Sequence, residues 1–272
     1  MFSDKKLMER MAPLLNKVLI VDPNVATARL LSEVARDAMH AHVWTVPNSE
    51  RGLKLAANVN PDVIFVEYQA DQLDGLQFTR DLRRSNFACR KAAVIMVTSQ
   101  ATTGILLAAR DAGVHEFLVK PFSLKDLMRR LEAVTLRKRD WVEAMRYIGP
   151  DRRRFNSGDY AGPRKRQDDG PQRSDQEQIQ EALKILRSAV LAAETDPVQA
   201  IRAMETQVET LCRVANEMGD PGLAHATREF ESYLAMTVVN GRALKVGELE
   251  ASAVELFRYL PPDDRPARLS AA

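Results

Sequence analysis

The sequence predicts a doubly wound α/β domain with a five-stranded parallel sheet, followed by a small all-α helical region. Three features of the 272-residue chain lead to this prediction. Short apolar runs alternate with helix-length segments over residues 17–137, an arginine-rich stretch occupies residues 138–173, and amphipathic patterns fill residues 174–262. The tail, residues 263–272, is expected to be disordered.

The apolar runs of the first domain lie at residues 18–21, 43–46, 63–66, 93–97 and 116–119. Each run is rich in β-branched or aromatic residues and too short for a helix, so each predicts a strand. Segments of helical length separate the runs. Because nearly continuous apolar strands alternate with helices, we expect a parallel sheet covered on both faces. Ligand chemistry in such a domain belongs at the carboxyl ends of the strands.

The segment after this domain has the composition of a flexible linker. Residues 146–166 hold seven basic and two acidic side chains, a net charge of +5, interrupted by glycines and prolines. A short unit is repeated there, since Tyr-Ile-Gly-Pro at 147–150 is echoed by Tyr-Ala-Gly-Pro at 160–163. We expect no regular structure in this linker.

Helix start signals return at residue 174. Ser174 followed by Glu177 is a capping box, and Asp-Pro pairs at 196–197 and 220–221 place an N-cap residue before a proline. Apolar residues recur at helical spacing after each signal, and a last apolar stripe spans residues 249–260. Four helices with short joints predict a small antiparallel bundle.

Composition narrows the functional classes. No apolar run of about 18 residues occurs, so no membrane span is expected. Cys89 and Cys212 are far apart and lack metal-ligand spacing, which favours a reducing cytoplasm and predicts no metal site. No Ser/His/Asp, Cys/His or glycine-rich phosphate motif is present, so we expect neither a conventional enzyme nor a cofactor.

Polar residues stand where the predicted strands end. Asp22 follows the first strand, Glu67 the third, Thr98 the fourth and Lys120 the fifth, with Phe117 three residues before the lysine. In this order and spacing, residues 17–135 resemble the receiver domain of bacterial response regulators and CheY proteins. The resemblance implies a flavodoxin-like sheet of order 2-1-3-4-5 and a role in two-component, phosphorelay signal transduction.

The chain departs from the family at its phosphorylation site. In the family, two acids after the first strand and an aspartate after the third hold Mg²⁺, and that aspartate accepts a phosphoryl group, which the threonine and lysine then bind. Here Pro23 replaces the second acid and Glu67 replaces the aspartate. The glutamate carboxylate reaches about 1.5 Å further, and a misplacement of about 1 Å costs roughly 100-fold in rate. We therefore expect a pseudo-receiver with negligible phosphorylation.

Two interpretations of Glu67 stay open. Its carboxylate either imitates an aspartyl-phosphate and favours an active-like arrangement of Thr98 and Phe117, or forms only a structural ion pair with Lys120. In both cases the resemblance implies a protein partner on the receiver face made by helix 4, strand 5 and helix 5. An enzyme-like alternative keeps slow phosphotransfer at Glu67.

The arginine-rich stretch resembles the extension of CheY-like cyclic-di-GMP effectors, receiver proteins that act on the flagellar motor or on attachment. Arginine pairs bidentately with guanine and phosphate, a carboxylate accepts from guanine, and tyrosine offers a stacking face. The residues expected to bind the dinucleotide are Tyr147, Asp151, Arg152, Arg153, Arg154, Arg164 and Arg166. The alternative is a solvated tether.

The helical region argues against two other functions. Residues 174–262 carry fourteen acidic and eight basic side chains, a net charge of −6 that opposes DNA binding. Their one histidine, His225, lacks the His-x-x-Lys-Gly pattern of phosphotransfer bundles. The function predicted from the sequence is a phosphorylation-independent signalling adaptor, with cyclic-di-GMP as its input in the alternative.

Overall fold

The computed structural model describes residues 2–137, 139–152 and 174–265. The described residues form two compact units, of which the first comprises residues 2–137, 139–142 and 147–152 and the second comprises 143–146 and 174–265. Each unit has hydrophobic clusters of its own.

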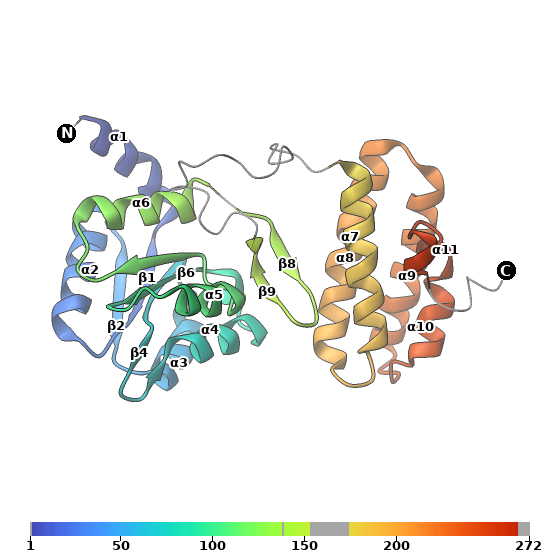
Figure 1. Ribbon diagram of the computed structural model, residues 1–272, viewed down its shortest axis with the longest axis horizontal. Coiled ribbons are helices and arrows are strands. Elements are labelled where there is room, and N and C mark those ends of the chain that lie inside the picture. Colours follow the sequence, from blue (N-terminus) through green and yellow to red (C-terminus); the bar gives the residue numbers. More distant parts are fainter. Residues whose placement is uncertain (1, 138, 153–173, 266–272) are drawn as a thin grey trace. The chain divides into compact units, whose positions relative to one another are not determined.

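A five-stranded parallel sheet forms the centre of the first unit (Figure 1). Its strands are β1 (Lys17–Val21), β2 (His42–Val46), β3 (Val63–Glu67), β6 (Ala93–Thr98) and β7 (Glu116–Val119). The order β2-β1-β3-β6-β7 is 2-1-3-4-5 when these five strands alone are counted, with every neighbouring pair parallel. The predicted fold class is therefore confirmed.

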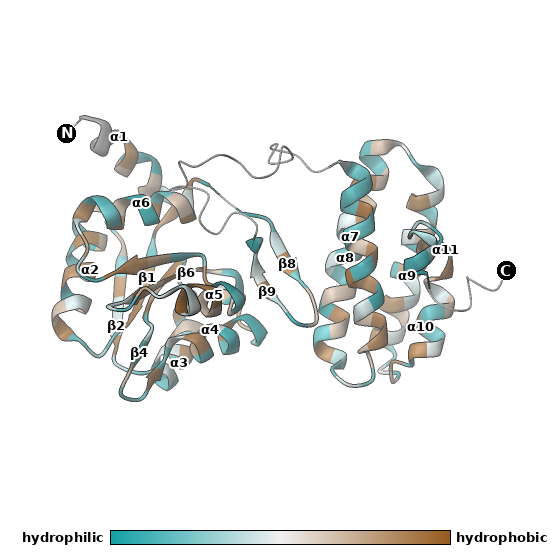
Figure 2. Cartoon of the chain, viewed as in Figure 1, coloured by the Kyte–Doolittle hydropathy of each residue, from teal (hydrophilic) through white to brown (hydrophobic). Residues whose placement is uncertain are grey.

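Helices cover both faces of this sheet. One face packs against α1 (Phe2–Met11), α2 (Val25–Met39) and α6 (Leu124–Thr135), and the other against α3 (Ser49–Val59), α4 (Gly75–Arg84) and α5 (Thr103–Asp111). Successive strand residues serve opposite faces, as Ile20 and Val21 do. The apolar colouring of the strands in Figure 2 follows from this burial on two sides. Helix α1 was not predicted, although Met11 at its end is fully buried.

Local signals in the sequence set where these helices begin. In each of α2 to α6, the residue before the helix accepts a hydrogen bond from a backbone N–H of the first turn. These N-cap residues are Asn24, Asn48, Asp74, Thr102 and Ser123. Each satisfies a backbone donor that has no partner within its own helix.

A tight hairpin joins β3 to α4. It consists of β4 (Gln69–Ala70) and β5 (Leu73–Asp74), which pair in antiparallel fashion. A Cβ atom on Gly75 would lie 2.3 Å from the carbonyl oxygen of Glu67. Only glycine lets the chain return this close to the end of β3, so Gly75 helps to define the surroundings of Glu67.

The prediction that the stretch from residue 138 lacks regular structure is wrong at its beginning. Two short strands, β8 (Trp141–Glu143) and β9 (Ile148–Pro150), form a two-stranded sheet. Tyr147 and Ile148 are both 6% exposed, so burial of apolar surface orders a segment whose composition is typical of a linker. Residues 153–173 lie outside the described residues.

The second unit is helical, as predicted. Its main helices are α7 (Asp175–Leu191), α8 (Pro197–Met218) and α9 (Pro221–Val239), followed by the short α10 (Val246–Ser252) and α11 (Val254–Phe257). The capping box at Ser174 and the N-caps at Asp196 and Asp220 are confirmed. Glu143 also belongs to this unit, where its side chain accepts a hydrogen bond of 3.1 Å from Gln199.

Two details of the second unit differ from the prediction. The single helix expected over residues 249–260 is interrupted at Ala253, next to Ser252, whose hydroxyl bonds back to the carbonyl of Leu249. The expected disordered tail begins with a 3-10 turn, Pro262–Asp264, held by a 2.6 Å hydrogen bond from Arg187 to the carbonyl of Asp264. Residues 266–272 lie outside the described residues. In the described ranges, every helix is too short or too polar to cross a membrane.

Candidate functional site

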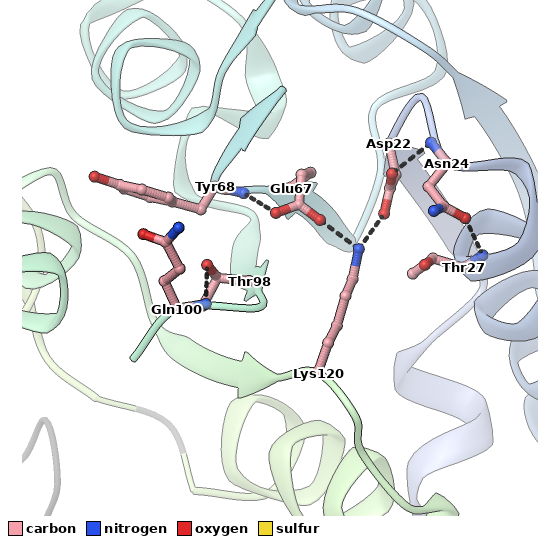
Figure 3. A network of polar contacts seen from close by, with 8 residues as sticks. All are labelled: Asp22, Asn24, Thr27, Glu67, Tyr68, Thr98, Gln100 and Lys120. Atoms are coloured by element: carbon pink, nitrogen blue, oxygen red, sulfur yellow. Dashed lines mark hydrogen bonds and ion pairs between the residues drawn. The ribbon is translucent and has the colours of Figure 1, made fainter. Parts of the chain in front are cut away.

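The strand-end residues singled out in the sequence gather at one edge of the parallel sheet. Glu67 and Thr98 are the last residues of β3 and β6, while Asp22 and Lys120 directly follow β1 and β7. Because the carboxyl ends of parallel strands meet at the same edge, four residues far apart in the sequence come together there (Figure 3).

Lys120 is the centre of this site. Its ammonium donates a hydrogen bond of 3.1 Å to Oδ2 of Asp22 and another to Oε2 of Glu67. The other oxygens of the two carboxylates accept from the backbone: Oδ1 of Asp22 from the N–H of Asn24 at 2.7 Å, and Oε1 of Glu67 from that of Tyr68 at 3.1 Å. The lysine therefore bridges two carboxylates that the backbone also orients.

Burial makes this network sensitive to charge. The side chains of Asp22, Glu67 and Lys120 are 2%, 12% and 21% exposed. Burial alone would lower the pKa of Lys120, but the hydrogen bond to Glu67 and the charge of Asp22 outweigh it and raise the pKa. The lysine is thus a cation at neutral pH, held between two carboxyl groups.

Thr98 and Phe117 lie in the same region but take no part in the ion-pair network. The Thr98 hydroxyl accepts a 3.0 Å hydrogen bond from the backbone of Gln100, as Figure 3 shows, and Thr98 is 2% exposed. Phe117 is 6% exposed and packs in the hydrophobic cluster on the α3–α4–α5 face of the sheet. Asp22, Glu67 and Lys120 are thus joined by direct hydrogen bonds. Thr98 and Phe117 are buried in the same region without a hydrogen bond to this network.

The same residues determine how well the edge suits a metal ion. Mg²⁺ requires near-octahedral oxygen ligands, usually including carboxylates. Both carboxylates here already bind the Lys120 ammonium, and Pro23 supplies no side-chain oxygen. In residues 2–137, 139–152 and 174–265, no group of three or more His, Cys, Asp or Glu side chains is placed to hold a metal. This donor set does not fit the family's Mg²⁺ site.

The arginine-rich stretch differs from the expected ligand site where it is described. Tyr147 is buried, its hydroxyl donates a 2.5 Å hydrogen bond to the carbonyl of Pro150, and burial raises the pKa of Tyr147 to about 12. The Arg152 guanidinium lies 4.3 Å from the centroid of the Tyr147 ring and 3.0 Å from Asp111. The backbone of Asp151 bonds to the carbonyl of Asp140. Four further predicted residues lie outside the described part of the chain: Arg153, Arg154, Arg164 and Arg166.

A buried cationic cluster on the first unit was missed in the sequence. Arg83 is 1% exposed, donates hydrogen bonds to three backbone carbonyls and lies 5.2 Å from the ring centroid of Trp141. Burial lowers the pKa of Arg83 to about 9 and that of its neighbour His115 well below 6.5. One signal for this burial was present in the sequence. Arg83 lies one helical turn after Thr79 and therefore on the same, buried side of α4.

A cavity of about 560 Å³ lies beside this cluster, at the amino-terminal edge of the sheet. Its lining includes Asp62, Lys91, His115 and Trp141. It is thus at the end of the strands opposite to Glu67 and Lys120, and it belongs to a different part of the domain from the strand-end site.

Comparison with known proteins relates part of the first unit to a protein family. Residues 18–132 match the family model described as response regulator receiver domain. The probable chemotaxis protein CheY of Rhizobium etli is 28% identical over 118 residues, which cover 43% of this chain and 91% of that protein. The transcriptional regulatory protein KdpE of Escherichia coli is 33% identical over 124 residues, covering 46% of this chain and 52% of that protein.

Solved structures are also similar to part of the chain. Chemotaxis protein CheY4 of Vibrio cholerae aligns with a TM-score of 0.42 and 24% identity, covering 44% of this chain and 98% of that one. The chain spans about half the length of KdpE. Residues 18–132 of this protein are therefore a response regulator receiver domain of two-component systems, with the CheY-like fold.

Proposed function

We propose that this chain is an atypical response regulator whose receiver domain works as a phosphorylation-independent signalling adaptor. One observation carries the proposal: the Lys120 ammonium is held between Asp22 and Glu67, and Glu67 ends the third strand of the sheet, where the resemblance to receiver domains implies the phosphoacceptor. The site therefore contains a negative charge paired to the lysine without any phosphoryl group.

Two features of the site oppose an ordinary phosphotransfer cycle. Pro23 stands where the family has a second acid, so one carboxylate ligand for Mg²⁺ is missing. The glutamate carboxylate extends about 1.5 Å beyond that of an aspartate, and a displacement of about 1 Å costs roughly 100-fold in rate. The missing ligand affects the metal and the longer side chain affects the nucleophile, so both lower the rate of phosphorylation.

The output of such an adaptor is binding to another protein. The face formed by α5, β7 and α6 corresponds to helix 4, strand 5 and helix 5 of a receiver domain, and it exposes Leu107, Val119 and Leu124 by 44%, 40% and 54%. Apolar side chains on neighbouring elements of one face support it as the partner-binding surface.

Acetyl phosphate with Mg²⁺, followed by mass spectrometry of the intact chain, tests this proposal. We expect no stoichiometric addition of a phosphoryl group. An addition that disappears in Glu67→Ala would instead support the alternative, slow phosphotransfer at Glu67. Retention of an addition in Glu67→Ala would place the modification elsewhere and leave the adaptor proposal intact.

Binding of cyclic-di-GMP through the arginine-rich stretch is the second candidate function, controlling motility or attachment. Its support is the net charge of +5 over residues 146–166, together with a half-exposed Arg152 at the end of the described segment. Tyr147 is an unsuitable stacking partner because it is buried and covered by Arg152. The candidate therefore depends on the arginines and not on that tyrosine.

Calorimetric titration of the full chain with cyclic-di-GMP tests this second candidate, with cyclic-di-AMP as the matched ligand. Guanine recognition predicts binding of the first dinucleotide only, at moderate affinity because a linker pays an ordering cost. Equal binding of both that vanishes with added salt would indicate phosphate attraction alone.

A further inference from the structure

The cavity of about 560 Å³ at the amino-terminal edge of the sheet is lined only by residues of the first unit. Three of these residues directly precede strands: Asp62 precedes β3, Ala92 precedes β6 and His115 precedes β7. The last turn of α6 adds Val134, and the start of β8 adds Trp141. Pockets of about 300–1,000 Å³ hold small organic molecules in proteins, so this cavity has the size of a ligand site.

His115 offers the cavity a hydrogen-bond donor. Its Nδ1 lies 3.2 Å from each of two donors, the backbone N–H of Val94 and Nη2 of Arg83. Because an arginine can only donate, Nδ1 must accept, and the proton of the neutral ring is on Nε2. Burial, together with the charges of Arg83 and Arg139, keeps the pKa of His115 well below 6.5, so this tautomer persists at neutral pH. Among the described residues, none accepts a hydrogen bond from Nε2.

Lys91 supplies a cation at the same cavity. It is exposed, and its ammonium lies 5.9 Å from the centroid of the Trp141 ring. Within the part of the chain that the structure describes, no carboxylate forms an ion pair with Lys91. The two arginines of the lining are each matched by a glutamate, since Arg137 pairs with Glu132 and Arg139 pairs with Glu116. Lys91 is therefore a positive charge available to a ligand.

The acid of the lining, Asp62, is engaged by the backbone. Its Oδ2 accepts hydrogen bonds of 2.9 Å from the N–H groups of Asn16 and Lys17. These bonds tie the start of β1 to the residue before β3. Since this carboxylate is engaged and both arginines are paired, the charge of Lys91 is left to act on an occupant. The cavity therefore favours an anion.

Much of the remaining lining is apolar. Trp141 is half-buried, and the centroid of its ring lies 6.4 Å from that of His115. Leu14, a large apolar residue, is 45% exposed and also lines the cavity. Smaller apolar residues extend this wall: Pro61, Ala88, Ala133 and Val134. A wall of this kind, with an indole ring in it, suits the ring of an aromatic ligand.

We propose that this cavity binds a small aromatic anion, whose carboxylate or phosphate pairs with Lys91 and accepts a hydrogen bond from Nε2 of His115. The ring of the ligand then packs against Trp141 and the apolar wall. Trp141 is the common neighbour of both polar groups, so one ligand can reach all three residues. The site lies at the edge opposite to Glu67 and includes none of the residues expected to bind cyclic-di-GMP. Its failure would therefore leave the proposed functions untouched.

Titration of the full chain with naphthoate, followed by NMR, tests this site through the indole N–H of Trp141 and Nε2 of His115. Naphthamide is the matched neutral ligand, because it has nearly the shape of naphthoate without its charge. Naphthyl phosphate distinguishes a phosphate site from a carboxylate site, and inorganic phosphate lacks the ring. We expect at least one naphthyl anion to shift both signals with a Kd on the order of 1 mM or lower. Naphthamide should bind at least about 10-fold more weakly, because it cannot pair with the ammonium.

Two variants of the lining and one control locate the binding. Lys91→Gln should weaken the binding of the anion at least about 10-fold by removing the cation. Ala88→Asp, at an exposed position of the lining, should weaken it by adding a negative charge. The exposed Lys125→Gln also removes a lysine, but outside the lining, and should bind as the parent chain does.

Three results would overturn the proposal. The first is the absence of a shift at Trp141 and His115 with about 10 mM of either naphthyl anion. The second is equal affinity for naphthamide or for inorganic phosphate, because the cavity would then recognise only the ring or only the charge. The third is an affinity that Lys91→Gln leaves unchanged, because the anion would then bind elsewhere on the chain.

Discussion

Lys120 pairs with Glu67 at the carboxyl-terminal edge of the parallel sheet, and the same ammonium pairs with Asp22. These ion pairs couple the stability of the domain to the charge of this site. They can therefore be examined both through stability and through the conformation of the proposed partner-binding face.

Replacing Lys120 by methionine should destabilise the receiver domain by about 2 kcal/mol at pH 8, since it leaves two carboxylates together without their cation. Their mutual repulsion raises the pKa of one carboxyl in the folded variant above its unfolded value of about 4.3. The loss is therefore full above that raised pKa and shrinks as the pH falls through it toward about 4.3. Urea unfolding followed by tryptophan fluorescence measures this, because Trp44 and Trp141 both belong to the first unit. The exposed Lys125→Met is the control and should change little.

Glu67→Gln distinguishes the two interpretations of the glutamate, because it removes the charge with little change in volume. If Glu67 imitates a phosphorylated state, methyl NMR signals of Leu107, Val119 and Leu124 should shift together. We expect this concerted shift because all three lie on the α5–β7–α6 face beside Lys120. Changes confined to the neighbours of residue 67 would identify a plain ion pair.

Restoring the acids should restore phosphorylation in a graded manner. Glu67→Asp alone is expected to accept little phosphoryl from acetyl phosphate, because Pro23 still removes a metal ligand. Adding Pro23→Asp should raise the labelling rate by at least about 100-fold, the scale of a misplaced reacting group. Equal labelling of the single and double variants would show that Pro23 is not the obstacle.

His115 should make the receiver domain less stable in acid. Its pKa is well below 6.5 because burial and the charges of Arg83 and Arg139 disfavour the imidazolium. A depressed folded pKa contributes stability that is present above about pH 6.5 and is lost as the pH falls, up to about 2 kcal/mol at pH 5. Fluorescence-detected unfolding at pH 7 and pH 5 should show a smaller pH dependence in His115→Asn, whereas the exposed His42→Asn should keep that of the parent chain.

Arg83→Met should cost about 3 kcal/mol, because the buried carbonyls of Gly113, Arg90 and Ala92 would lose their donor. The same substitution should expose Trp141, which lies against the guanidinium, and shift its fluorescence to longer wavelength. Arg80→Met, on the exposed side of α4, provides the comparison. Equal stability of the two variants would mean that water replaces the guanidinium at these carbonyls.

The sequence was sufficient to predict the fold and the centre of the strand-end site. The apolar runs identified the five strands, and parallel strands bring their carboxyl ends to one edge, so Asp22, Glu67 and Lys120 could be placed together without coordinates. Helix N-caps such as Ser174 and Asp196 could also be predicted from the sequence, because a cap is a contact between residues two or three positions apart.

The sequence by itself thus determined what depends on local patterns and on the general geometry of a parallel sheet. Only the tertiary structure decided the burial of Arg83 and of Tyr147. Arg83 meets the carbonyl of Gly113 across 30 positions and Arg152 meets Asp111 across 41. An arginine-rich segment has the same composition whether it is an unstructured linker or an ordered part of the fold. The difference in free energy between these two states comes from burial against residues distant in the sequence, which local patterns do not encode.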